Sequence, residues 1–180
     1  MTCVPRSPAS SPFETERVPI QILLNGSEET LQVRMHDSLL DALREAGLVG
    51  AKRGCETGDC GACSVLLDGN VVTSCTLLAL QADGRRVDTI EGLSERDRLH
   101  PLQQAFLDHA AVQCGFCIPG MLVTLHALLE RHPDASPAEV REAMTLCRCT
   151  GYTKPLDAVF DYQRHRQAGG HSGHPPDEAP

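Results

Sequence analysis

The chain has 180 residues, of which 41% are hydrophobic but only 3% aromatic, so a globular core must be built mainly from aliphatic side chains. Its formal net charge of −8 argues against nucleic acid or an anionic membrane surface as a partner, because both bind clustered Lys and Arg. No apolar run reaches the roughly 18 residues of a membrane span, and the N-terminus carries no export signal, so we expect a cytoplasmic protein.

The first elements predicted along the chain are a hairpin and a helix. Residues 1–17 are rich in Pro and Ser and are expected to be a disordered leader. Two apolar-rich runs then flank Asn25-Gly26, a dipeptide typical of tight hairpin turns. The leucines of HDSLLDALREAGLVG recur at helical spacing, with Asp37 or Ser38 as a natural cap and Gly47 near the end.

A second hairpin and a closing strand complete this half of the chain. The segment SVLLDGNVVTSC is predicted to turn at Asp68-Gly69-Asn70, and residues 86–90 are predicted to form the last strand. Two hairpins, one helix and one further strand indicate a small mixed sheet folded against a helix. We assign this unit to residues 18–92.

The C-terminal half of the chain shows helical patterns instead. The first predicted helix has a shared face made of Leu102, Ala105, Phe106 and His109. A second helix is predicted to open at Pro119, a third after the capping box Ser136–Glu139, and a fourth at about 155–165. We assign this helical unit to residues 93–166 and expect a disordered tail over 167–180.

Nine cysteines are many for a chain of this length, and their grouping indicates metal binding. Thiols stay reduced in the cytosol, which disfavours a disulfide framework. Cys3 is left over in the leader, and the other eight fall into two groups of four. These are Cys55, Cys60, Cys63 and Cys75, then Cys114, Cys117, Cys147 and Cys149.

The first group has the spacing C-x4-C-x2-C, with Cys75 following after eleven residues. This spacing matches the plant-type [2Fe–2S] pattern, whereas structural zinc sites prefer C-x2-4-C pairs. In such a site a loop wraps one face of the cluster and a distant fourth thiolate closes the other. Gly58 and Gly61 would permit positive φ and let backbone amides approach the sulfurs.

The second group, C-x2-C…C-x-C, is less specific by spacing alone. A zinc site with four cysteine ligands stays open as an alternative to a cluster at this point. Cys114 and Cys117 precede one predicted helix, while Cys147 and Cys149 lie between two others. All four thiolates could therefore converge between helix ends, where helix N-termini favour an anionic cluster.

Three motifs in this order resemble a known family. The motifs are GCETGDCGACSVLLDG at 54–69, QCGFCIPGM at 113–121 and LCRCTGY at 146–152. Together they resemble the iron–sulfur subunit of the molybdenum hydroxylase (xanthine dehydrogenase) family, and the resemblance covers about residues 17–166. It implies an α+β fold, with an N-terminal β-grasp, plant-type ferredoxin-like domain followed by an all-α four-helix [2Fe–2S]-binding domain.

The resemblance also implies the roles of the site residues. By carry-over, the cysteines of the first group bind a ferredoxin-type [2Fe–2S] cluster, and those of the second group bind the cluster of the helical domain. In this family the helical cluster lies nearest the molybdopterin cofactor, which contacts the Gln before the first Cys of that group, here Gln113. The ferredoxin-type cluster lies towards FAD.

The sequence itself offers no site for substrate chemistry. It contains no Gly-rich strand–turn–helix for FAD or NAD and no Ser/His/Asp arrangement. We therefore expect an electron-transfer protein. The family resemblance implies that it is a subunit of a heteromeric oxidoreductase, with a large molybdopterin subunit and a medium FAD subunit, or a cytochrome acceptor, in a dimer of heterotrimers. The alternative is a free-standing two-cluster ferredoxin-like carrier.

Overall fold

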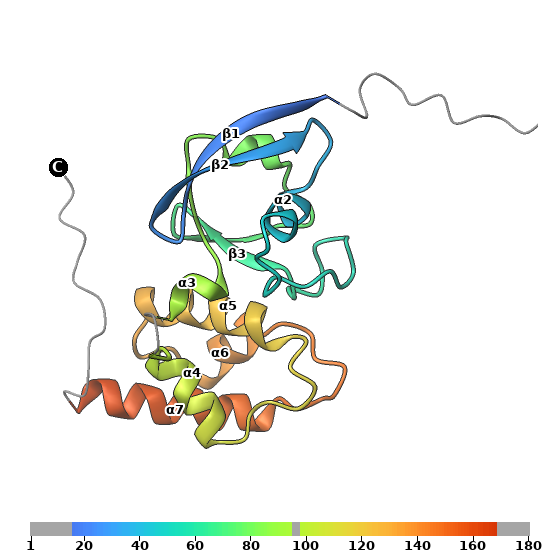
Figure 1. The fold of residues 1–180 in the computed structure, drawn as a ribbon. Coiled ribbons are helices and arrows are strands. Elements are labelled where there is room, and N and C mark those ends of the chain that lie inside the picture. Colours follow the sequence, from blue (N-terminus) through green and yellow to red (C-terminus); the bar gives the residue numbers. More distant parts are fainter. Residues whose placement is uncertain (1–15, 95–97, 169–180) are drawn as a thin grey trace, which may run out of the picture.

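A mixed five-stranded sheet forms the first half of the described structure (Figure 1). The computed structural model describes residues 16–94 and 98–168, so most of the predicted leader and tail lies outside the described residues. The strands are β1 (Arg17–Leu24), β2 (Ser27–Arg34), β3 (Ser64–Leu67), β4 (Asn70–Thr73) and β5 (Arg86–Asp88). Their order is β2-β1-β5-β3-β4; β1 and β5 run parallel, and the other neighbours are antiparallel.

Both predicted hairpins are confirmed. Between β1 and β2, Asn25 and Gly26 have φ angles of 51° and 83°, as a two-residue turn of the mirror-image type requires. Between β3 and β4, Asp68 and Gly69 have φ angles of 49° and 73°. The conformation of each turn matches the register of the strands that it joins.

The closing strand is shorter than predicted. It ends at Asp88, and Thr89 caps a short helix, α3 (Ile90–Leu93), that the sequence did not indicate. The Asn25 side chain accepts a hydrogen bond from the Thr89 backbone amide at 2.8 Å. Because this tertiary contact takes the amide that a longer strand would use for pairing, the strand prediction for 89–90 is wrong.

One helix and a 3-10 turn cover the sheet. Helix α2 (Leu39–Glu45) begins after Ser38, whose side chain accepts from the Asp41 amide, so the predicted cap is confirmed. The turn η1 (Ala79–Ala82) packs beside it. A hydrophobic core of buried aliphatic side chains fills the space between these elements and the sheet. Its most enclosed members are Ile20, Val33, Leu39, Leu40, Leu43, Val65 and Val87.

The C-terminal half is helical, and Figure 1 shows its helices gathered below the sheet. They are α4 (Pro101–Asp108), α5 (Ile118–Arg131), α6 (Pro137–Ala143) and α7 (Thr153–Gln167). Pro101 and Pro137 lie in first turns, where a missing amide hydrogen costs no helical bond. His109 caps the C-terminus of α4 instead of lying within it, which corrects the predicted extent of this helix.

A second hydrophobic cluster holds the helices together. Its fully enclosed side chains are Leu102, Phe106, Met121, Leu125, Leu129, Val140, Ala158 and Val159. Helix α5 packs against α4 and α6 and also against β3 and β4, so it belongs to both halves of the structure. None of the described helices is long and apolar enough to cross a lipid bilayer.

Candidate iron–sulfur centres

The first cysteine group gathers at one end of the β3–β4 hairpin. Cys63 directly precedes β3, and Cys75 follows β4 by two residues. The hairpin pairs Ser64 with Thr73, and the Ser74 hydroxyl donates to the Cys63 carbonyl at 2.7 Å. The side chains of Cys63 and Cys75 interact as a result. The hairpin register therefore brings the distant fourth cysteine to the loop that carries the other three.

Backbone amides within the loop point at a sulfur. The amides of Thr57 and Cys60 both donate to the Cys55 Sγ at 3.4 Å. The Thr57 hydroxyl and then these amides lower the pKa of Cys55 to about 6. Since metal ligation requires the thiolate, this environment favours the ligating form of an exposed cysteine.

The loop turns through left-handed backbone conformations at three residues. Gly58 and Gly61 have φ angles of 86° and 73°, which confirms the prediction that these glycines adopt positive φ. Glu56 has φ of 58° without being glycine, which the sequence did not indicate. These turns fold the loop around the Cys55 sulfur.

Two cysteines of this group, Cys63 and Cys75, lie deeper in the fold than Cys55. Cys63 is 2% exposed, and Cys75 is half-buried beside it. Burial, followed by the interaction with Cys63, raises the pKa of Cys75 to about 11. A bound iron would supply the positive charge that favours the thiolate of Cys75.

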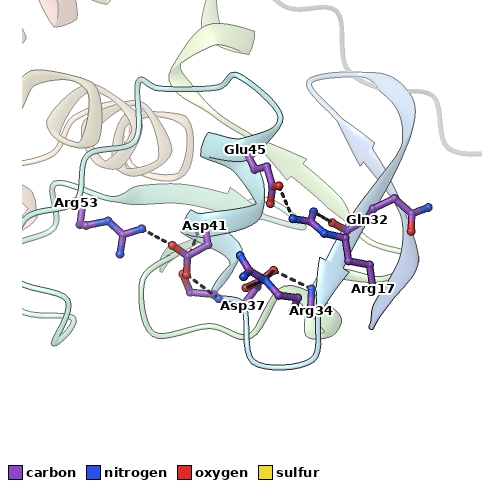
Figure 2. Close-up of polar contacts among 8 residues, drawn as sticks. Arg17, Gln32, Arg34, Asp37, Asp41, Glu45 and Arg53 are labelled. Carbon is purple, nitrogen blue, oxygen red and sulfur yellow. Dashed lines mark hydrogen bonds and ion pairs between the residues drawn. The ribbon is translucent and has the colours of Figure 1, made fainter. Parts of the chain in front are cut away.

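An ion pair between Arg53 and Asp41 fastens the loop to helix α2, as Figure 2 shows. Arg53, two residues before Cys55, pairs with Asp41 on α2 and with Glu56 within the loop. Partial burial raises the pKa of Asp41, but hydrogen bonds from Ser38 and Arg53 outweigh this effect and keep the pKa below its ordinary value. The capped start of α2 thereby anchors the ligand loop.

The second cysteine group converges between helix ends. Cys114 and Cys117 lie in the loop before α5, and Cys147 and Cys149 lie between α6 and α7. The side chains interact in two pairs, Cys114 with Cys149 and Cys117 with Cys147. All four line one small cavity. The structure thus brings the four cysteines of this group together between helix ends, as the sequence predicts.

Cys114 and Cys117, the two cysteines of the loop before α5, differ in exposure. Cys114 is exposed, and the backbone amide of Phe116 lowers the pKa of its thiol. Cys117 is 6% exposed at the N-cap of α5, and burial raises the pKa of its thiol to about 11. The positive end of the α5 dipole lies beside Cys117 and favours an anionic group there.

The Tyr152 side chain holds the backbone of Cys147 in place. The Tyr152 hydroxyl accepts a hydrogen bond from the Cys147 amide at 2.8 Å and lies 3.4 Å from the Cys147 carbonyl. Tyr152 was not among the site residues expected from the sequence. Its position directly after the Cys-x-Cys motif was the only signal of this role.

Gln113 lies at the exposed edge of the same cavity. Its side chain packs against Gly151, where an added Cβ would lie 2.5 Å from the Gln113 Nε2. The space that Gly151 leaves open therefore decides where the Gln113 amide sits.

The donor chemistry of both groups fits a [2Fe–2S] cluster. Each offers four thiols and no oxygen or nitrogen ligand, and backbone amides approach a sulfur in each group. Among residues 16–94 and 98–168, no three His, Cys, Asp or Glu side chains are arranged to hold a metal ion as they stand.

Comparison with known proteins identifies the family. Residues 22–92 match the 2Fe-2S iron-sulfur cluster binding domain, and residues 89–160 match a second [2Fe-2S] binding domain. The nicotine 6-hydroxylase small subunit of Paenarthrobacter nicotinovorans is 46% identical over 84% of this chain and 93% of its own. The chain belongs to the iron–sulfur subunits of the molybdenum hydroxylase family.

Other relatives of this iron–sulfur subunit support the same family. The xanthine dehydrogenase iron-sulfur-binding subunit of Escherichia coli O157:H7 is 39% identical over 83% of this chain and 97% of its own. The crystal structure of quinoline 2-oxidoreductase from Pseudomonas putida 86 superposes with a TM-score of 0.81 and 42% identity. It covers 87% of this chain and all of the matched chain.

Proposed function

We propose that this chain is the electron-transfer subunit of a heteromeric molybdenum hydroxylase and that each cysteine group holds one [2Fe–2S] cluster. The first cluster would be held by Cys55, Cys60, Cys63 and Cys75, and the second by Cys114, Cys117, Cys147 and Cys149. The observation that carries the proposal is the gathering of each group by separate elements of the fold, in a chain whose relatives are iron–sulfur subunits.

The proposal includes the finer architecture of the family. The sheet unit, residues 18–92, would be a β-grasp ferredoxin-like domain, and residues 93–166 a four-helix cluster domain. The separate hydrophobic clusters of the sheet and of the helices support this division.

The protein's own residues would prepare both sites for electron transfer. Each cluster, when bound, would carry one electron at a time, so that the two electrons released by an oxidation at a molybdopterin centre would pass singly to FAD or another acceptor. Amides at Cys55 and Cys114 stabilise negative charge on sulfur, while the burial of Cys63 and Cys117 excludes water. Each group thus extends from the surface into the interior.

The surface beside the second group supports docking of a large molybdopterin subunit. Val112, Phe116 and Leu146 are 39%, 46% and 62% exposed, and they flank the cysteine loops and the exposed Gln113. Apolar residues that stay exposed around a functional site are typical of an interface. Gln113 would contact the pterin at the centre of this surface.

The first group would face the acceptor. We propose a medium FAD subunit there, with a cytochrome as the alternative acceptor, and a cytoplasmic dimer of heterotrimers as the assembly. The free-standing two-cluster carrier is the second candidate function. The exposed apolar residues beside the Cys114 group favour the subunit, since a freely diffusing carrier gains nothing from such a surface.

Purification of the native protein from its own cells by a tag on this chain tests the proposal. Iron, sulfide, molybdenum and flavin are measured in the purified material, and copurifying chains are identified by mass spectrometry. We expect two larger subunits with molybdenum and flavin. Recovery of a lone chain that contains iron but no molybdenum would support the free carrier instead.

A further inference from the structure

Three backbone segments meet between the two cysteine groups. They are residues 60–62 of the first ligand loop, Gly120 in the first turn of α5, and residues 145–146 before Cys147. An added Cβ at Gly120 would lie 2.3 Å from the Gly61 carbonyl oxygen and 3.1 Å from the Ala62 Cα. The first ligand loop therefore rests directly on the start of α5, with no room for a side chain between them.

The backbone of Gly120 does not itself require glycine. Gly120 is a buried helical residue and is absent from the residues with positive φ. Intrinsic helix propensity favours Ala over Gly at such a position. The requirement for glycine at 120 comes from the close approach of the ligand loop.

The third segment closes the contact from the other side. An added Cβ at Gly61 would lie 2.9 Å from the Thr145 Cγ2, and Gly61 also has positive φ. Thr145 is only 5% exposed. Gly61 is thus enclosed between Gly120 and Thr145.

Hydrogen bonds tie the same segments to ligand cysteines. The Leu146 amide donates to the Cys60 carbonyl at 2.9 Å, and the Thr145 hydroxyl donates to the Cys117 carbonyl at 3.3 Å. One bond ends on each cysteine group. The contact therefore joins the frameworks of both groups and not merely two neighbouring surfaces.

We propose that the contact between Gly61 and Gly120 sets the separation of the two cysteine groups, so that Gly120 is a positioning residue for electron transfer between them. This inference rests on the proposed function, in which one electron leaves the centre held at Cys114 and is gained by the centre held at Cys55, with no bond made or broken. The rate of electron tunnelling falls steeply with distance. A small shift of the ligand loops therefore slows the transfer between the two groups even where each group still binds its cluster.

Substitution of Gly120 by Ala provides the test. To reach ordinary van der Waals contact, the 2.3 Å approach must open by about 1 Å, which pushes the first ligand loop away from α5. The full-length protein is reduced until both clusters are paramagnetic, and the magnetic interaction between them is measured by electron paramagnetic resonance at low temperature. We expect Gly120→Ala to weaken the spin–spin splitting while iron content stays at the wild-type level.

Gly92→Ala is the matched control. A Cβ at Gly92 would lie 2.3 Å from the Asn25 Oδ1, the same close approach at a place away from both cysteine groups. We expect this variant to lose thermal stability and to keep the wild-type splitting. An unchanged splitting in Gly120→Ala, or an equal loss in both variants, would overturn the inference.

If Gly120→Ala yields no protein with bound clusters, a second pair of variants tests whether this contact sets the separation of the two cysteine groups. Thr145→Val and Thr145→Ile both lose the hydroxyl, but only Ile adds a carbon on the branch that carried it, where the carbon pushes the 145–146 segment away from the Cys117 carbonyl. We expect a weaker splitting in Thr145→Ile than in Thr145→Val, and equal splittings would contradict the inference. If the unmodified protein holds fewer than two clusters, the proposed function is wrong. If it holds two clusters but no variant changes the splitting, only the inference about Gly120 is wrong.

Discussion

Cysteines that look equivalent in the sequence differ strongly in the folded chain. The thiol of Cys55 is exposed and has a pKa of about 6, whereas burial raises those of Cys75 and Cys117 to about 11. The exposed thiols are held by amide donors, and the buried ones need the charge of a metal to ionise.

Each of the eight cysteines is assigned to one cluster only, so that replacing one of them should affect one cluster only. Cys149 interacts with Cys114, and its replacement by Ser removes a thiolate from the second group alone. We expect Cys149→Ser to abolish or alter one of two paramagnetic signals of the reduced protein. Cys3→Ser is the control, because Cys3 belongs to neither group, and both signals should persist in it. Loss of both signals in Cys149→Ser would show that the two sites are not independent.

Gly151 makes a second prediction at this scale. An added Cβ there would lie 2.5 Å from the Gln113 Nε2 and 3.3 Å from its Cδ, so Gly151→Ala must displace the Gln113 amide. We expect the purified complex to lose molybdenum relative to iron, as Gln113→Ala should also do.

The same ratio in Gly92→Ala, whose close approach lies elsewhere, should match the unmodified complex. A molybdenum-to-iron ratio that is unchanged in Gly151→Ala would mean that the position of the Gln113 amide does not matter for the pterin.

Single residues were predictable from the sequence only where a spacing or a backbone requirement exposed them. The positive φ of Gly58 and Gly61 followed from the need for a tight ligand loop, and the structure confirms it. Tyr152 and Gly120 could not be assigned, because their roles depend on atoms that are distant in sequence: the Cys147 backbone folded back onto Tyr152, and the Gly61 carbonyl packed on Gly120.

At the scale of elements, local signals predicted most boundaries. The turn at Asn25-Gly26, the cap at Ser38 and the capping box at Ser136 each lie where the sequence places them. These features depend on neighbours within three residues. The end of β5 was mispredicted because the Asn25 side chain, 64 residues earlier in the chain, binds the Thr89 amide.

The contact between α4 and α7 makes an element-level prediction with a pH dependence. The His109 Nε2 lies 3.2 Å from the Asp161 Oδ2, and His109 and then Arg164 lower the pKa of Asp161. A carboxylate with a lowered pKa stabilises the fold above its unfolded pKa of about 3.9 and ceases to do so as the pH falls through the folded value. We expect Asp161→Asn to lower the melting temperature slightly at pH 6.5.

The difference between this variant and the unmodified protein should shrink as the pH approaches 4 and should vanish below the folded pKa of Asp161. Glu28→Gln is a suitable control, since Glu28 lies on the exposed end of β2. A difference in melting temperature that stays constant or grows on acidification would rule out the Asp161 carboxylate as its source.

On the scale of the whole molecule, α5 connects the two halves. It packs on β3 and β4 as well as on α4 and α6, and Arg131 at its end donates to the Gly69 carbonyl at 2.7 Å and the Asn70 Oδ1 at 2.9 Å. The close approach of Gly61 to Gly120 adds a backbone contact at the other end of the helix. The sheet and the helices therefore share packing along the length of α5.

Shared packing predicts cooperative unfolding of the protein with its clusters in place. Differential scanning calorimetry should show a single transition, because the sheet cannot unfold without exposing one side of α5. Arg131→Ala should lower this transition without splitting it. Two separated transitions in the unmodified protein would indicate that the halves unfold independently.

The packing of the two halves against each other could not be predicted from the sequence. The change from strand to helical patterns gave the order of the units, and the cysteine motifs gave the family. The packing of α5 on the sheet depends on the absence of a side chain at Gly120 and on contacts such as Arg131 to Gly69, which no local pattern encodes.

We propose that this chain holds two [2Fe–2S] clusters, one at each cysteine group. Iron and acid-labile sulfide per chain, measured together with the electron paramagnetic resonance spectrum of the reduced protein, test it most directly. The account predicts about four irons and four sulfides per chain, with two distinct signals. Two irons with a single signal, or zinc in place of iron at either group, would contradict it.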